Sequence, residues 1–328
     1  MTTNKIIKPK VTILMATYNG EEFVKEQIES IIVQSYDNWD LLIRDDQSTD
    51  DTLNILTEYE KKEARIKIIR DENGNVGQCT NFDLLMQRCL NVEGYYMFAD
   101  QDDVWNSNKV ELSLRKIMEV EKTTNQGIPI LIYTNYLISD SELSQTKLAY
   151  KKPFYYSKKE LASRLLVQNW MMGCTMIINN PLLELSVNIP IEAENHDNWI
   201  AILSSLVGRV DFLNETTMKH RIHSNNVTTQ IKTASFSARL VRLFSRFRTN
   251  NKTFEKRTLL LTHIKNRIID YSDQDGLETL GNYSNLLKTR GFEAVNIAYK
   301  YKFNGVNKIQ TTLLFMQLMV KNTKPKSF

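Results

Sequence analysis

Residues 95–103 read YYMFADQDD, an apolar run that ends in the carboxylates Asp100, Asp102 and Asp103. The run predicts a buried β-strand, because short apolar segments of this length fill the interior of a sheet. Carboxylates this close together repel one another, and a folded protein tolerates the repulsion best where a cation or a metal-bound diphosphate is held. The alternative is a solvated loop that caps the next helix. The segments around this stretch decide between the two.

A short apolar strand followed by a helix occurs four times between residues 11 and 120. The strands are expected at 11–15, 39–43, 66–69 and 95–99, and the helices at about 21–34, 50–62, 78–90 and 108–120. This alternation through short connections predicts a parallel sheet covered by helices. Strands at 130–133, 174–178 and 209–213 and helices at 158–167 and 199–207 follow less regularly, and from about residue 229 the pattern is almost wholly helical.

Polar clusters follow three of the predicted strands. They are Tyr18-Asn19, Asp45-Asp46 and the acidic stretch 100–103. Since the carboxyl ends of parallel strands meet at one rim of the sheet, where ligands bind in such folds, the three clusters favour a functional site. The carboxylates suit Mg²⁺ or Mn²⁺, and Asp45 or Asp46 suits a nucleoside base or ribose. The joint at residues 73–77 matches no phosphate-binding fingerprint and is equally well a plain turn.

Two later segments carry candidate chemistry. Residues 194–199 read ENHDNW and place Asp197 at the start of a helix, where an acid is also ordinary because the helix dipole favours it. Residues 219–226 read KHRIHSNN and include Arg221 and His223, which suit a diphosphate but also suit a solvated loop.

Composition limits the class of protein. The 328 residues are 42% hydrophobic and 24% charged with a net charge of +4, as expected of a soluble globular chain. Three cysteines without disulfide or metal-ligand spacing fit a reducing compartment. Neither a signal peptide at residues 1–10 nor a membrane-spanning run is expected, which favours a cytoplasmic location.

The helical end is more basic than the rest. Residues 236–247 place Phe and Leu on one flank and arginines on the adjoining one, and lysines follow the apolar stretch 313–320. Such a helix can lie on an anionic membrane surface. The alternative is a helix packed on the preceding domain, with solvated arginines.

Together these segments resemble the family 2 glycosyltransferases of the GT-A fold, over roughly residues 10–226. The matching stretches are ATYNG at 16–20, RDDQSTD at 44–50, NVG at 75–77, DQDD at 100–103 with Trp105, and HDNW at 196–199. Within the family the chain is most similar to bacterial rhamnosyltransferases, through GCTM at 173–176, the HDNW segment and RIHSNNVT at 221–228. Gln47 stands where the family usually has Gly, and Gln101 is a larger spacer than usual, which concerns the donor preference.

The resemblance implies a role for each matching residue. Asp197 would be the general base of an inverting, metal-dependent sugar transfer. The donor nucleotide would be held by Thr17, Tyr18, Asn19, Asp45, Asp46 and Asp100. Arg221 and His223 would lie near the diphosphate, and the metal, Mg²⁺ or Mn²⁺, would be bound by Asp100, Asp102 and Asp103.

The implied architecture is an α/β GT-A domain over residues 1–228, a Rossmann-like, mostly parallel sheet flanked by helices. It would have a nucleotide-binding part at 10–125 and an acceptor-side part at 126–228, followed by a C-terminal helical extension at 229–328 that is a candidate for membrane association. The expected activity is transfer of L-rhamnose from dTDP-L-rhamnose to a lipid-linked or oligosaccharide acceptor of cell-surface polysaccharide synthesis, at the inner face of the membrane. The alternatives are a UDP-hexose donor or, from another class, a sugar-nucleotide-binding protein without turnover. No nucleic-acid partner is expected.

Overall fold

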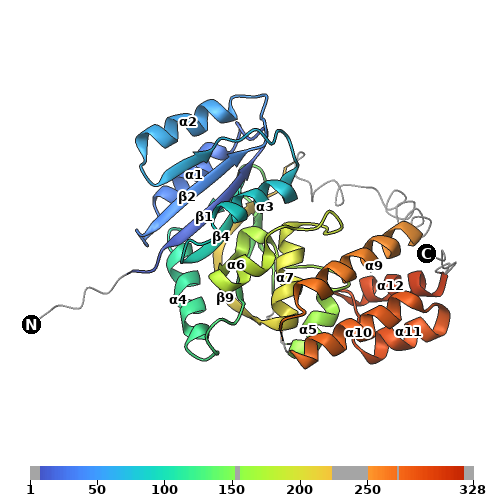
Figure 1. Ribbon diagram of the computed structural model, residues 1–328. Helices are drawn as coiled ribbons and strands as arrows, with labels where there is room; N and C mark the ends of the chain where they lie inside the picture. Colours follow the sequence, from blue (N-terminus) through green and yellow to red (C-terminus); the bar gives the residue numbers. More distant parts are fainter. Residues whose placement is uncertain (1–7, 152–155, 224–249, 272, 321–328) are drawn as a thin grey trace, which may run out of the picture.

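A computed structural model describes residues 8–151, 156–223, 250–271 and 273–320 (Figure 1). The strands are β1 (Val11–Thr17), β2 (Trp39–Asp45), β3 (Ile66–Ile69), β4 (Tyr95–Asp100), β5 (Val104–Trp105), β6 (Ile130–Ser139), β7 (Thr146–Leu148), β8 (Met176–Asn179) and β9 (Arg209–Arg221). The helices are α1 (Val24–Ile32), α2 (Thr52–Lys62), α3 (Gln78–Arg88), α4 (Lys109–Glu121), α5 (Lys158–Leu165), α6 (Asn180–Ser186), α7 (His196–Val207), α9 (Asn250–Arg267), α10 (Gln274–Lys288), α11 (Gly291–Lys300) and α12 (Lys308–Val320).

The strands form one sheet in the order β3-β2-β1-β4-β8-β6-β9-β5, with β7 paired to β6. Strands β1 to β4 are parallel to their neighbours among these four, as the alternating pattern predicts. Their register pairs Thr17 of β1 with Asp45 of β2, and Ala16 of β1 with Asp100 of β4. The carboxyl ends of three strands therefore meet at one rim. Beyond β4 the sheet is mixed, because β8 is antiparallel to both β4 and β6 whereas β9 is parallel to β6.

Side chains of β1 alternate between two hydrophobic cores. Val11, Ile13 and Met15 face a core shared with α1, α2 and α4, and Leu14 faces the opposite core, shared with α3, α5, α6 and α7. This two-residue period is what a strand covered on both faces requires. The sheet is thus a rigid platform from which the rim loops project.

The C-terminal helices pack on the second core. Buried side chains of α9 to α12, including Leu261, Ile264 and Leu286, belong to the same hydrophobic cluster as those of α5 and α7. In Figure 1 these helices gather beside α5 and α7, away from α1 and α2. Acidic residues of α10 and its cap also face α5, since Lys159 pairs with Glu278 at 2.9 Å.

The helical segment predicted at residues 236–247 and the lysines at 321–326 lie outside the described residues. Within the described part, the strand predicted at 209–213 runs on to Arg221, so part of the expected polar loop at 219–226 is strand. The expected strand at 174–178 starts at Met176, after a 3₁₀ turn at Gly173–Thr175. The short elements β5, β7 and α6 were not predicted.

Candidate functional site

The carboxylates after β4 lie in different environments. Asp100 ends the strand, and Gln78 Nε2 donates a hydrogen bond to its Oδ1 at 3.3 Å. Burial, and then the charges of Asp103 and Asp102, raise the pKa of Asp100 to about 8. Burial and Asp103 also raise the pKa of Asp102, although its Oδ2 lies 2.9 Å from His223 Nε2. The ionised forms of both carboxyls are therefore disfavoured unless a cation neutralises them.

Asp103 is fully buried and forms an ion pair inside the protein. Its Oδ1 lies 2.8 Å from Nδ1 of His220. Burial alone would lower the pKa of His220, but Asp103, with Asp100 and Asp102, raises it to about 9. One side-chain atom each of Asp103, Cys174 and His220 lie within 4.8 Å of one another. Because His220 already neutralises Asp103, this residue is the least available of the three predicted metal ligands.

Arg221 and His223 both reach the acidic loop. Arg221 Nε donates to the carbonyl of Asp102 at 3.0 Å, and its other nitrogens bond the carbonyl of Ser141 and the carboxylate of Glu26. Its guanidinium also lies 4.5 Å from the ring centroid of Phe23. Arg221 therefore fixes the loop against α1, while His223 contacts the Asp102 carboxylate directly.

The turn after β1 carries residues that are predicted to bind the donor nucleotide. Tyr18 is 49% exposed. The side chain of Gln101 holds the Tyr18 backbone at both polar groups: Tyr18 N–H donates to Oε1 at 2.8 Å, and Nε2 donates to the Tyr18 carbonyl at 2.9 Å. Asn19 has a φ of 46° and accepts a hydrogen bond from the Thr49 N–H at 2.8 Å. These bonds join the loops after β1, β2 and β4.

The two acids after β2 do different things. Asp45 is half-buried at the rim, where the hydroxyl of Thr17 and the N–H of Ser48 each donate to it at 2.8 Å. Asp46 is buried and accepts the N–H groups of Val76 at 2.9 Å and Gly77 at 2.7 Å. Asp45 is thus the acid that faces the rim, and Asp46 anchors the joint at residues 73–77.

Asp197 lies in the first turn of α7. Burial raises the pKa of its carboxyl to about 6, although the N–H groups of Asn198 at 2.6 Å and Gly173 at 3.2 Å both donate to it. Its neighbour His196 packs on Phe98 of β4, with the ring centroids 5.2 Å apart, so the start of α7 lies beside the strand that ends at Asp100. A carboxyl with this pKa is ionised at neutral pH and basic enough to accept a proton, as a general base requires.

His196, the neighbour of Asp197, is buried between aromatic rings. Its ring centroid lies 4.0 Å from that of Phe82, and burial lowers its pKa to about 3, so the ring is neutral. A Cβ added to Gly173 would lie 2.4 Å from His196 Nε2. This close approach of Gly173 lets its N–H reach Asp197.

The donor set at the acidic loop fits a hard divalent cation. Asp100 and Asp102 offer carboxylate oxygens, and burial together with the neighbouring carboxyls raises the pKa of both, so a bound cation would stabilise their ionised forms. Mg²⁺ and Mn²⁺ prefer such oxygens and keep further positions for water or phosphate. The chemistry of Asp100 and Asp102 therefore fits their predicted role as metal ligands.

Several functional contacts were not predicted from the sequence. His220 lay within a predicted polar cluster but received no role, because its partner Asp103 is 117 positions away in the chain. Lys109, whose pKa burial lowers to about 8, donates to the Thr217 hydroxyl at 3.2 Å behind the same loop. The one available signal was the unusual size of Gln101, which the structure explains by its bonds to Tyr18.

The family model described as Glycosyl transferase family 2 matches residues 12–175, half of the chain. The UDP-Glc:alpha-D-GlcNAc-diphosphoundecaprenol beta-1,3-glucosyltransferase WfgD of Escherichia coli is 27% identical over 195 residues, which cover 59% of this chain and 69% of that protein. The dTDP-rhamnosyl transferase RfbG of Shigella flexneri is 40% identical over 99 residues, 30% of this chain and 34% of that protein.

Among solved structures, residues 1–349 of TarS from S. aureus in complex with UDP-GlcNAc align with a TM-score of 0.54 at 15% identity. The alignment covers 89% of this chain and 73% of that one. The expected α/β GT-A fold is therefore confirmed. Across the residues that the structure describes, we find no helix with the length and hydropathy needed to cross a bilayer.

Proposed function

Because this chain belongs to glycosyl transferase family 2, we propose that it moves a sugar, with inversion, from a nucleotide-diphosphate donor to a hydroxyl of a cell-surface polysaccharide intermediate. The observation that carries this proposal is the position of Asp197 in the first turn of α7, which packs through His196 on Phe98 of β4, the strand that ends in the acidic loop. Asp197 would take the proton of the acceptor hydroxyl while its oxygen attacks the anomeric carbon. The bond from that carbon to the diphosphate breaks, and the diphosphate leaves with the electron pair on the opposite face.

The other residues divide between nucleotide and leaving group. Thr17, Tyr18 and Asn19 would form the nucleoside end together with Asp45, while Asp46 supports the neighbouring joint and Asp100 reaches the ribose. A Mg²⁺ or Mn²⁺ ion on Asp100 and Asp102, with Asp103 behind them, would stabilise the negative charge of the leaving diphosphate. His223, which contacts the Asp102 carboxylate, would act near that diphosphate, and Arg221, which bonds the Asp102 carbonyl, would hold the loop in position.

We propose dTDP-L-rhamnose as the donor. Its support is the identity of 40% to a dTDP-rhamnosyl transferase, which spans only 99 residues. The second candidate is a UDP-hexose, supported by the 27% identity over 195 residues to a UDP-glucose-dependent enzyme. The name of that enzyme gives a diphosphoundecaprenol saccharide as its acceptor, and we propose a lipid-linked or oligosaccharide acceptor here as well.

A lipid-linked acceptor would be met at the inner face of the cell membrane, and the C-terminal helices suit such a surface. Phe292 of α11 and Ile309 of α12 are 82% and 74% exposed. Between residues 288 and 320 the chain has five basic residues and one acid, Glu293. Exposed apolar side chains among cations bind anionic lipid surfaces. We therefore propose a catalytic domain at 1–228 and a C-terminal helical region at 229–328 that would meet the membrane through α11 and α12.

The direct test is nucleotide release by the full-length protein from dTDP-L-rhamnose, UDP-glucose, UDP-galactose and UDP-N-acetylglucosamine, with and without EDTA. Release confined to dTDP-L-rhamnose supports the leading donor, and release from a UDP-sugar supports the alternative. Release that EDTA leaves unchanged would contradict the metal assignment. Absence of release from every donor, by protein whose circular dichroism shows a folded state, would count against the transferase proposal itself.

A further inference from the structure

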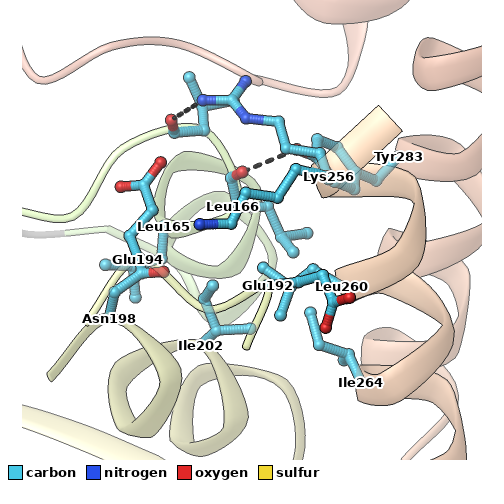
Figure 2. A pocket seen from close by; sticks show the side chains of 12 residues that line it. Leu165, Leu166, Glu192, Glu194, Asn198, Ile202, Lys256, Leu260, Ile264 and Tyr283 are labelled. Carbon is cyan, nitrogen blue, oxygen red and sulfur yellow. Dashed lines mark hydrogen bonds between the residues drawn. The ribbon is translucent and has the colours of Figure 1, made fainter. Parts of the chain in front are cut away.

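Two hollows lie along the side of α9 that faces the catalytic domain. The first is drawn in Figure 2 and has a volume of about 40 Å³. Its floor is apolar, with Ile202 of α7 and Leu260 and Ile264 of α9, and its polar lining includes Glu194, Asn198 and Lys256. A space of this size admits a few water molecules or one substituent of a sugar, but not a whole ring.

The second hollow is larger and more polar, with a volume of about 450 Å³. This volume falls within the range of small-molecule binding sites. Its lining is Asn188, Pro190, Trp199, His263, Asn266, Arg267 and Asp270. Between the two hollows, His263 Nε2 lies 3.4 Å from Glu192, a residue that lines the first hollow. The two spaces are thus neighbours along one helix.

The first hollow adjoins the catalytic turn. Glu194 and Asn198, which line it, stand on either side of Asp197 in the chain, and the charge of Glu194 acts on the Asp197 carboxyl. Lys256 of α9 lines the same hollow as Glu194 and Asn198. A molecule lying along α9 would therefore approach Asp197 at the Lys256 end.

We propose that this groove along α9 binds the acceptor saccharide. The larger hollow would hold the sugar units that precede the reacting one, and the smaller hollow a substituent of the reacting unit. Amide, carboxylate and guanidinium groups around the larger hollow offer both donors and acceptors, as hydroxyl-rich sugars need. Charges of both signs line each hollow, which favours a neutral saccharide over an anionic ligand. The inference rests on the proposed function and deepens it by assigning the acceptor class and the helix that binds it.

The test is saturation-transfer NMR on the full-length protein with L-rhamnose, D-glucose, D-galactose and N-acetyl-D-glucosamine as probes. Saturating dTDP and UDP are present to fill the donor site. We expect saturation of at least one probe by the wild-type protein. The double variant Asn266→Ala with Asp270→Ala removes two exposed polar groups from the larger hollow and should weaken that signal at least threefold. Lys265→Ala, an exposed residue of α9 that lines neither hollow, is the matched control and should leave it unchanged.

Two results would overturn the inference: no saturation of any of the four sugars, or an equal signal from the double variant. Neither result depends on turnover. Failure of saccharide binding is therefore distinguishable from failure of the proposed transfer, which is measured by nucleotide release without any probe sugar. Circular dichroism of the double variant excludes unfolding as the cause of a lost signal.

Discussion

At Asp197, burial and hydrogen bonding act in opposite directions on one carboxyl. Burial raises the pKa, whereas the N–H groups of Asn198 and Gly173 lower it, and the result is about 6. A general base works only in its ionised form. The residue therefore loses its proton as the pH rises through about 6, and the proposed activity has to rise over the same interval.

We expect kcat/KM for sugar transfer to increase with pH around an inflection near 6, and Asp197→Asn to reduce kcat by about 100-fold to 10,000-fold, the usual contribution of a general base. The measurement is a pH–rate profile from pH 5 to 8 with the donor identified by nucleotide release. Donor affinity of the variant, measured by calorimetry, should stay close to that of the wild type. A variant that turns over at the wild-type rate would show that another group is the base.

Gly173 positions this carboxyl by its lack of a side chain. A Cβ there would lie 2.4 Å from His196 Nε2, and the His196 ring has little room to move because it packs on Phe82. Gly173→Ala should lower the free energy of unfolding by about 1–3 kcal/mol through overpacking. It should also reduce kcat, since the Gly173 N–H no longer reaches Asp197.

The measurements are urea unfolding and nucleotide release by the same variant. Gly281→Ala is the control, because a Cβ at this helical glycine of α10 meets nothing within 4 Å. Helix propensity predicts a gain of about 0.5–1 kcal/mol for that control. Equal behaviour of the two variants would contradict the positioning role of Gly173.

The sequence predicted the positions of residues that follow strands, and it missed contacts between residues far apart in the chain. Tyr18, Asp45 and Asp100 were placed at one rim from strand order alone, and the register of β1 with β2 and β4 brings them there. The ion pair of Asp103 with His220 could not be predicted, because it depends on how β9 packs beside β5. The roles assigned to these residues remain predictions.

At the scale of elements, Asp46 links β2 to the start of α3. Its carboxylate accepts the N–H groups of Val76 and Gly77 and pairs with Arg44 at 3.0 Å. Gly77 has a φ of 81°, so this joint has a conformation that needs both the glycine and its anchor.

Asp46→Ala should therefore destabilise the protein by about 3 kcal/mol, because it leaves buried donors without an acceptor and removes one partner of a buried cation. Arg44 retains Asp71 at 2.9 Å, which limits the loss. The measurement is the free energy of unfolding in urea. Asp40→Ala on the same strand is the control: its pair with Lys10 is partly exposed and should cost less than about 1 kcal/mol. A loss no larger than that of the control would contradict the anchoring role.

The elements of the first half were predicted with nearly their observed bounds, whereas several elements of the second half were predicted with bounds that differ from the observed ones, for a physical reason. Strands β1 to β4 are short apolar runs separated by helices, and local periodicity is sufficient to find them. Strand β9 is 13 residues long with a largely half-exposed pattern, and its pairing with β6 shifts register near Asn135. The length of this strand is set by its pairing with β6, which the local sequence pattern does not report.

At the scale of the whole molecule, charge is divided between the C-terminal helices. The acidic start of α10 faces α5, where Asp273 and Glu278 pair with Lys158 and Lys159. The basic stretch from residue 288 onward carries the exposed apolar residues instead. The helical region can thus pack on the catalytic domain through one part and present another to a membrane, so the two alternatives open at the sequence level are compatible.

We expect the full-length protein to float with vesicles containing phosphatidylglycerol and to stay unbound with neutral phosphatidylcholine. Phe292→Ser with Ile309→Ser should reduce the bound fraction at least threefold, because these two exposed apolar side chains could no longer enter the acyl boundary. Leu277→Ser is the control, since Leu277 is also exposed but lies on acidic α10. Equal loss in the control, or flotation with neither vesicle, would argue against a membrane-facing role for α11 and α12.

One side chain, Gln101, ties the acidic loop to the backbone of Tyr18 through both ends of its amide. It fits there because Gly20 has no Cβ, which would otherwise lie 2.4 Å from Gln101 Oε1. A displacement of either loop is therefore transmitted to the other through Gln101. Ligands bound at the two ends become thermodynamically linked, and linkage is reciprocal: by whatever factor a cation tightens nucleotide binding, the nucleotide tightens cation binding. The spacer between the two acids would thus couple the two halves of the proposed donor site.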